Sequence, residues 1–348
     1  MSASKSLRAE AAKRILIKDG AYGTSIQGKK LQSADYCGGL DLLKDQRGNN
    51  DLLNITRPEV VRSICESFAD AGAEILATNT FNANAISQAD YGAEALVRQI
   101  NRSSAEIMRG VADSYSARDG RPRWVAGALG PTNKTLSLSP DVNDPGFREV
   151  DFDQVKAVYR EQIEALVEGG VDFILIETIF DTLNAKAAVM ATLEAEQDLG
   201  RELPLMISMT LTDLSGRNLS GHTVEAFWAS VRHAKPITIG LNCSFGAAQL
   251  RPHLTALAAT ADTLIMAYPN AGLPNELGEY DEAAEQTAAQ VREWAESGLV
   301  NIVGGCCGTP PSHIAAIAGA VRDSTPRTVP AVRSGTLLAG LEPMVIAA

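Results

Sequence analysis

The stretch VKAVYREQIEALVEGGVDFILIET, residues 155–178, contains one helix pattern and one strand pattern, and it indicates how the whole chain folds. Apolar residues recur at helical spacing in its first half, at Val155, Tyr159, Ile163 and Leu166. Gly169-Gly170 ends that repeat. The run 171–178 is then almost continuously apolar, which is typical of a parallel strand covered on both faces. The stretch predicts a helix followed by a buried parallel strand.

Seven further apolar, β-branched runs predict strands at 14–20, 74–81, 123–130, 203–210, 237–244, 262–270 and 299–307. Helix patterns lie between them. One opens with a capping-box spacing at Thr56–Glu59 and ends at Gly72, one ends before Gly298, and the last opens at Thr309-Pro310. Eight strands alternating with helices predict an α/β fold, a (β/α)8 TIM barrel, with a doubly wound open sheet as the alternative.

Two long connections follow predicted strands, at residues 21–57 and 130–152. In a barrel both would lie at the C-terminal face, where active sites are built. We expect a single barrel domain over residues 1–325. Residues 326–348, with scattered Pro and Gly and no clear period, are expected to form a tail or linker.

Composition narrows the class of protein. The 348 residues are 45% hydrophobic, and 31 basic against 42 acidic residues give a net charge of −11, which argues against nucleic acid or an anionic membrane as partner. No apolar stretch reaches the ~18 residues of a membrane helix, and the N-terminus lacks a secretory signal. We therefore expect a cytoplasmic protein with reduced thiols, in which five cysteines, an odd number, serve a metal or catalysis rather than disulfides.

Three cysteines stand at predicted strand ends: Cys243, Cys306 and Cys307. Zinc favours thiolate ligands, and a catalytic zinc site uses three protein ligands and leaves one position open. Adjacent cysteines reach one ion only where the strand bends, and the glycines on both sides of the pair tolerate the backbone angles of a bend. A phosphate-binding glycine loop is the alternative, but it leaves both thiols unexplained. Cys37 and Cys65 are expected to be packing residues.

The predicted site suits alkyl transfer to a thiol. The four histidines lie away from the strand ends, so the ligands would be all sulfur, and three thiolates on Zn²⁺ leave a net charge of −1, a weak Lewis acid. Such an ion favours a substrate thiolate over activated water. Asp19 and Glu177 could bind a substrate ammonium group. Backbone N–H groups of the turn containing Gly20, Ala21 and Thr24 could bind a carboxylate.

Lys18 is expected on the face opposite to Asp19, because side chains alternate along a strand. No other predicted strand end carries a lysine. This placement argues against a Schiff-base aldolase.

The motifs at these positions resemble those of a known family, the homocysteine-binding barrel of cobalamin-dependent methionine synthase, a homocysteine S-methyltransferase. The similarity covers residues from about 14 to 320. It rests on DGAYGTSIQ (19–27), RGNNDLLNITRPEVV (47–61), ATNTFNAN (77–84), GPTNKTLSLSPDVNDP (130–145), ILIETIFDTLNAKAA (174–188), GLNCS (240–244), YPNAGLPN (268–275) and NIVGGCCGT (301–309).

The resemblance implies roles for particular residues. The family's zinc cysteines fall on Cys243, Cys306 and Cys307, and its acidic ligands for the homocysteine amino group fall on Asp19 and Glu177. The asparagine of the YPNAG loop, Asn270, looks like the residue that approaches zinc before substrate arrives.

The resemblance also implies the reaction. A zinc-activated homocysteine thiolate takes a methyl group from methylcobalamin, with 5-methyltetrahydrofolate as the ultimate donor, and methionine forms. The RGNNDLL and SPDVNDP segments favour this cobalamin-dependent branch. The chain has no D-x-H-x-x-G cobalamin signature, so a corrinoid module or protein, and a folate-binding one, are the expected partners. The alternatives are S-methylmethionine or betaine as donor, or a non-catalytic zinc- or thiol-binding barrel.

Overall fold

In the computed structural model, which describes residues 2–331 and 335–346, eight parallel strands curl into a barrel. The strands are β1 (Leu16–Ile17), β2 (Ile75–Ala77), β3 (Trp124–Leu129), β4 (Phe173–Ile179), β5 (Leu205–Met209), β6 (Thr238–Gly246), β7 (Leu264–Asn270) and β8 (Ile302–Val303). Their order is β1-β8-β7-β6-β5-β4-β3-β2. A parallel bridge between Lys18 and Ile75 joins β1 to β2 and closes the ring. The predicted (β/α)8 barrel is confirmed, and the open doubly wound sheet is excluded.

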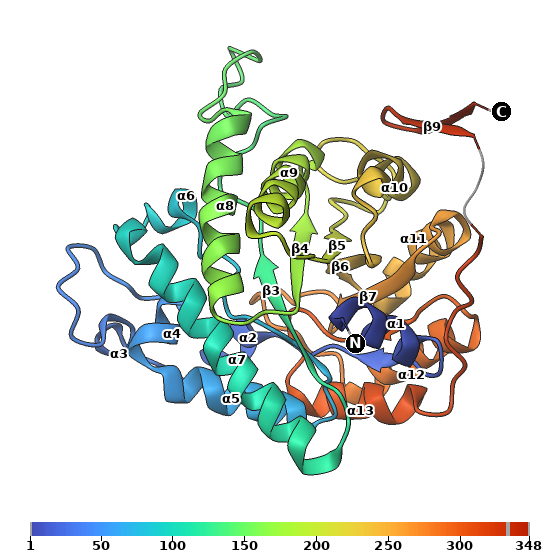
Figure 1. The fold of residues 1–348 in the computed structure, drawn as a ribbon, viewed down its shortest axis with the longest axis horizontal. Helices are drawn as coiled ribbons and strands as arrows, with labels where there is room; N and C mark the ends of the chain where they lie inside the picture. The colour runs from blue at the N-terminus through green and yellow to red at the C-terminus, as the bar shows by residue number, and fades with distance from the viewer. Residues whose placement is uncertain (1, 332–334, 347–348) are drawn as a thin grey trace.

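Helices surround the strands (Figure 1). The main barrel helices, one after each strand, are α5 (Pro58–Asp70), α7 (Val97–Asp119), α8 (Phe152–Glu168), α9 (Thr182–Leu199), α10 (Val224–Val231), α11 (Ala247–Thr260), α12 (Ala284–Glu296) and α13 (Pro311–Val321). The additional helices are α1 (Ala3–Ala11), α2 (Tyr22–Gln27), α3 (Ser33–Cys37), α4 (Leu53–Thr56) and α6 (Ala85–Gln88). Within the described residues, no helix is both long and apolar enough to cross a membrane.

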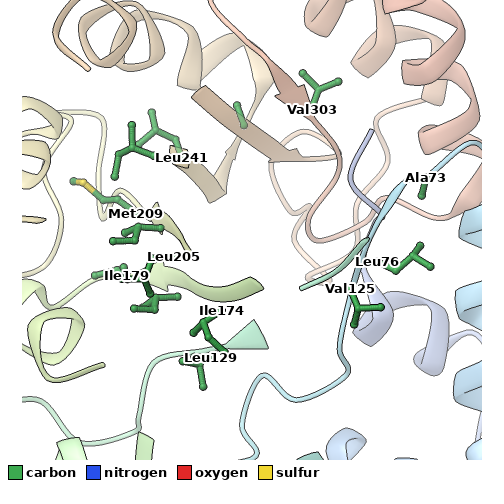
Figure 2. Packing of buried hydrophobic residues seen from close by; sticks show 14 of the residues in the cluster. Ala73, Leu76, Val125, Leu129, Ile174, Ile179, Leu205, Met209, Leu241 and Val303 are labelled. Atoms are coloured by element: carbon green, nitrogen blue, oxygen red, sulfur yellow. The ribbon is translucent and has the colours of Figure 1, made fainter. Parts of the chain in front are cut away.

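The apolar core has two layers, because side chains alternate along each strand. One layer lies between strands and helices and includes Val125, Ile174 and Leu241 (Figure 2). The other fills the barrel with residues of the opposite parity, such as Phe173 and Leu175, and α1 joins it through Leu7 and Ala11. The interior is therefore a packed core, and chemistry is confined to the strand ends.

Some local predictions were wrong. β8 ends at Val303, so the cysteine pair lies in a loop and not in a strand. The connection 21–57 is not an open loop but holds α2, α3 and α4. The N-cap of α5 is Arg57, directly before Pro58, and the capping box at Thr56 does not form. The second long connection holds no helix or strand between β3 and α8, as predicted.

The predicted tail contains a two-stranded antiparallel hairpin, β9 (Thr336–Ala339) and β10 (Pro343–Ile346). Thr223, before α10, donates its N–H to the carbonyl of Leu341 at the hairpin turn. The buried guanidinium of Arg327 donates to three carbonyls at or just after the C-terminal end of α11, those of Ala258, Ala261 and Thr263. Residues 332–334 and 347–348 of the predicted tail lie outside the described residues.

Candidate active site

Three sulfur atoms meet at the C-terminal mouth of the barrel. The Sγ atoms of Cys243, Cys306 and Cys307 all lie within 4.8 Å of one another, and those of Cys243 and Cys307 are 3.8 Å apart. Zinc–sulfur bonds of ~2.3 Å in a tetrahedron place sulfurs about 3.8 Å apart, so the residues fit zinc. This is the one such group of three His, Cys, Asp or Glu side chains among the described residues.

The backbone of β6 is distorted where it presents its cysteine. Leu241 faces the helices, so regular alternation would turn Cys243 in the same direction. Instead the β6–β7 register shifts between Asn242 and Gly246, and Cys243 has a φ of 62°. A bulge of this kind re-aims a side chain, and here it turns the thiol toward the barrel mouth.

The glycines around the cysteine pair serve mainly close approach, which corrects the expectation that all of them supply unusual backbone angles. A Cβ on Gly304 would lie 2.8 Å from the Cβ of Lys18, and one on Gly305 would collide with the side chain of Thr309. Only Gly308 has a positive φ, 76°. Close packing of β1, the loop and α13 therefore fixes the pair.

The three thiols share their protons unequally. Hydrogen bonds from Cys243 and Cys306 lower the pKa of Cys307 far below its usual range. Hydrogen bonds with both other thiols, together with burial, raise the pKa of Cys306 well above it. For Cys243 the bond with Cys306 lowers the pKa, but the bond with Cys307 and burial outweigh it and the pKa is raised to about 11. One thiolate and two thiols are thus present at neutral pH.

Polar side chains surround the sulfurs. The Oδ1 of Asn270 accepts the N–H of Cys307 at 3.1 Å, and its Nδ2 lies 3.5 Å from the hydroxyl of Tyr280. Tyr280 also hydrogen-bonds the Cys307 thiolate. Asn242 directs its Nδ2 at the Cys306 sulfur, 3.8 Å away. Our sequence reasoning missed Tyr280, which lies in the connection between β7 and α12.

The top of the barrel interior is charged. Glu177 on β4 accepts a hydrogen bond from the hydroxyl of Tyr268 at 2.9 Å, and Asp19 accepts the N–H of Ala77 at 2.7 Å through Oδ2. Burial raises the pKa of both carboxyls, and Lys18 acts against that rise. The expected acidic pair is therefore present, but a cation already lies beside it.

That cation corrects the prediction for Lys18. Lys18 does not face away from Asp19, because its Nζ lies 2.8 Å from the Asp19 Oδ1. Leu16 points into the barrel, so Lys18, of the same parity, does too. The Asp19 carboxylate also turns toward Lys18, although Asp19 is the next residue in the chain.

A cavity of about 250 Å³ connects these groups. Its lining includes Lys18, Gly20, Ala21, Thr24, Glu177, Cys243, Cys306 and Cys307. Asp19 is fully buried behind it. The Ala21 N–H donates to Thr309 O at 3.3 Å and the Thr24 hydroxyl accepts the Gly308 N–H at 3.0 Å, so the turn is tied to the cysteine loop.

Asp51 is a further lining residue that sequence reasoning missed. It is 3% exposed and accepts the Asn82 N–H at 3.3 Å. Burial raises its pKa to about 7. A larger, open groove of about 940 Å³ lies beside the C-terminal ends of α11, α12 and α13, away from these groups.

The sequence profile of the homocysteine S-methyltransferase family matches residues 16–321. The chain belongs to this family. Its fold is also similar to three structures of the homocysteine methyltransferase MmuM from Escherichia coli. The metallated form has a TM-score of 0.70 at 22% identity and covers 90% of this chain and 98% of its own. The oxidized form has a TM-score of 0.69 at 22% identity, with coverage of 88% and 95%. The apo form has a TM-score of 0.64 at 20% identity, with coverage of 88% and 96%.

Family membership supports methyltransferase activity on homocysteine. At 20–22% identity the likeness to MmuM shows the shared barrel alone.

Proposed function

We propose that the protein transfers a methyl group from methylcobalamin to the sulfur of homocysteine and so forms methionine. The observation that carries this proposal is the convergence of Cys243, Cys306 and Cys307 at the mouth of a cavity that also holds Glu177. Three sulfurs suit a metal that retains a thiolate, and a carboxylate suits an amino acid's ammonium group.

The three cysteines would hold zinc, and Asn270 and Tyr280 lie beside Cys307. Zinc bound there would keep a substrate thiol deprotonated at neutral pH. The chain's own residues would orient the substrate. Asp19 and Glu177 would face its ammonium group, and the turn containing Gly20, Ala21 and Thr24 would face its carboxylate. Holding the sulfur and the donor's methyl carbon in line is the main contribution of such a site.

The donor would approach from the C-terminal face. The connection 130–151 has no regular structure and borders that face, where it would contact the carrier. A corrinoid protein or module would bring methylcobalamin, and a folate-binding one would supply its methyl group. We place the protein in the cytoplasm, where its thiols stay reduced.

The test is a donor comparison on one zinc-loaded preparation, with homocysteine as acceptor and methionine as product. We expect turnover with methylcobalamin, free or carried on a corrinoid protein. Turnover with S-methylmethionine or betaine only would show that one of these compounds, and not methylcobalamin, is the methyl donor. Zinc binding without methionine from any donor would instead indicate a non-catalytic barrel.

A further inference from the structure

Lys18 places an ammonium group inside the barrel, at the base of the cavity. Its side chain is 4% exposed, and its Nζ lies 2.8 Å from the Asp19 Oδ1. The same nitrogen lies 4.6 Å from the centroid of the Tyr268 ring. The hydroxyl of that ring donates to Glu177, so one cation faces both members of the acidic pair.

The lysine stays charged in this position. Burial opposes the charge, but attraction to Asp19 and to Glu177 outweighs burial and raises the pKa of Lys18. The Tyr268 ring adds a favourable cation–π contact. Of the two charge states open to Lys18 and Asp19, we assign the ion pair, because Asp19 also accepts the Ala77 N–H through its other oxygen.

A ligand's ammonium group brought to these carboxylates would meet a like charge already there. A site built around unpaired polar groups rejects an analogue that lacks the matching group by ~10⁴-fold, because its own groups are left unsatisfied. Asp19 is not left unsatisfied without a ligand, since Lys18 remains its partner. The penalty for binding a ligand without an ammonium group is therefore smaller than in a site whose carboxylates have no other partner.

We propose that Lys18 is a specificity-determining residue, a resident ammonium that competes with the substrate's ammonium for Asp19 and Glu177 and so weakens selection for an α-amino group on the thiol substrate. This inference rests on the proposed function. It means that the site accepts thiol acids without an α-amino group almost as well as homocysteine.

The first test compares homocysteine with 4-mercaptobutanoate, which lacks only the amino group, by calorimetric titration of the zinc-loaded protein. We expect the two dissociation constants to lie within about tenfold of one another, far below the ~10⁴-fold preference of a site whose polar groups need the ligand. A larger preference for homocysteine overturns it and leaves the proposed function intact. Binding of neither thiol overturns both.

The second test removes the resident charge in Lys18→Met and Lys18→Gln, with the exposed Lys5→Met as matched control. The preference for homocysteine should rise at least about tenfold in both variants through tighter homocysteine binding, because a like charge has been removed. Equal weakening of both thiols would show that Lys18 holds the carboxylate and would overturn the proposal, as would an unchanged ratio. If a variant loses zinc or its fold, the ratio of the two dissociation constants in the wild-type protein decides whether the proposal holds.

Discussion

Zinc binding should release about two protons per ion at pH 7–8, because two of the three thiols are protonated in the metal-free protein. Only Cys307 is ionised beforehand, and the pKa values of Cys243 and Cys306 are raised. All three must be thiolates to bind the metal. The apparent affinity should therefore rise about a hundredfold per pH unit between pH 6 and 8, and it should fall as pH falls.

Titration of zinc into metal-free protein, in buffers of different ionisation enthalpy, counts the protons, and chelator competition gives the affinity. Cys243→Ser should release about one proton and bind zinc at least about a hundredfold more weakly, since it removes a direct ligand. Cys37→Ser, whose half-buried thiol lies outside the cluster and donates to Leu40 O, is the matched control and should still release about two. Release near zero in the wild type, or two protons in Cys243→Ser, would refute the assignment.

Three other substitutions test parts of the site. Asp51→Asn should stabilise the protein increasingly from pH 4 to 8, by up to about 4 kcal/mol, because the Asp51 carboxyl, whose pKa burial raises from 3.8 to about 7, ionises more readily in the unfolded chain and so favours unfolding. Urea unfolding at several pH values measures this, and a pH-independent difference would contradict it. Asn242→Ala should weaken zinc binding about tenfold in chelator competition without lowering zinc stoichiometry, since it removes a donor to Cys306; unchanged affinity would count against that contact. Gly305→Ala should cost about 1–3 kcal/mol of unfolding free energy, because its methyl group would collide with Thr309, and a neutral effect would show that the loop can shift.

The barrel was predictable because the same sequence pattern, a continuous apolar strand followed by an amphipathic helix, recurs along the chain. The convergence of the three cysteines followed from the same reasoning, because parallel strands present their C-terminal ends at one face. Lys18 shows where the reasoning failed. Lys18 lies two residues after Leu16, so strand alternation already placed both side chains on the same, inward face. We instead assigned the inward face to Asp19, because a carboxylate suits the substrate's ammonium group. Asp19 lies two residues beyond the end of β1, where strand alternation does not decide the direction of its side chain.

The bulge in β6 was not predictable either. Cys243 and Ser244 have φ values of 62° and 61°, and neither is a glycine. Such residues cost about 1–2 kcal/mol each in that region, so only tertiary contacts hold them there. One such contact pairs the hydroxyls of Ser244 and Thr210 at 2.7 Å. Contacts between distant segments of this kind leave no periodic signal in a single sequence.

Asn242 connects this distortion to a second one, on β4. Thr178 follows Glu177 and has a φ of 58°, and the β4–β5 register shifts beside it. The Asn242 side chain accepts the Thr178 N–H at 3.1 Å and donates to its hydroxyl at 2.8 Å. Through the same Nδ2 it also reaches the Cys306 sulfur. One amide thus couples the strand that carries the carboxylate to the loop that carries two of the three sulfurs.

This coupling explains why the residues with strained backbone angles lie next to the sulfurs and the carboxylate of the site. The sulfurs are positioned by backbone contacts as well as by one another, since Cys306 donates its N–H to Pro269 O at 2.8 Å and Cys307 donates to Asn270. If β6 were regular, Cys243 would point at the helices, and only the two thiols of the loop after β8 would face the cavity. The strained bulge supplies the third, and the contacts of its neighbours keep it from relaxing. The three-sulfur geometry is therefore a property of the folded barrel, on which the affinity for a metal depends.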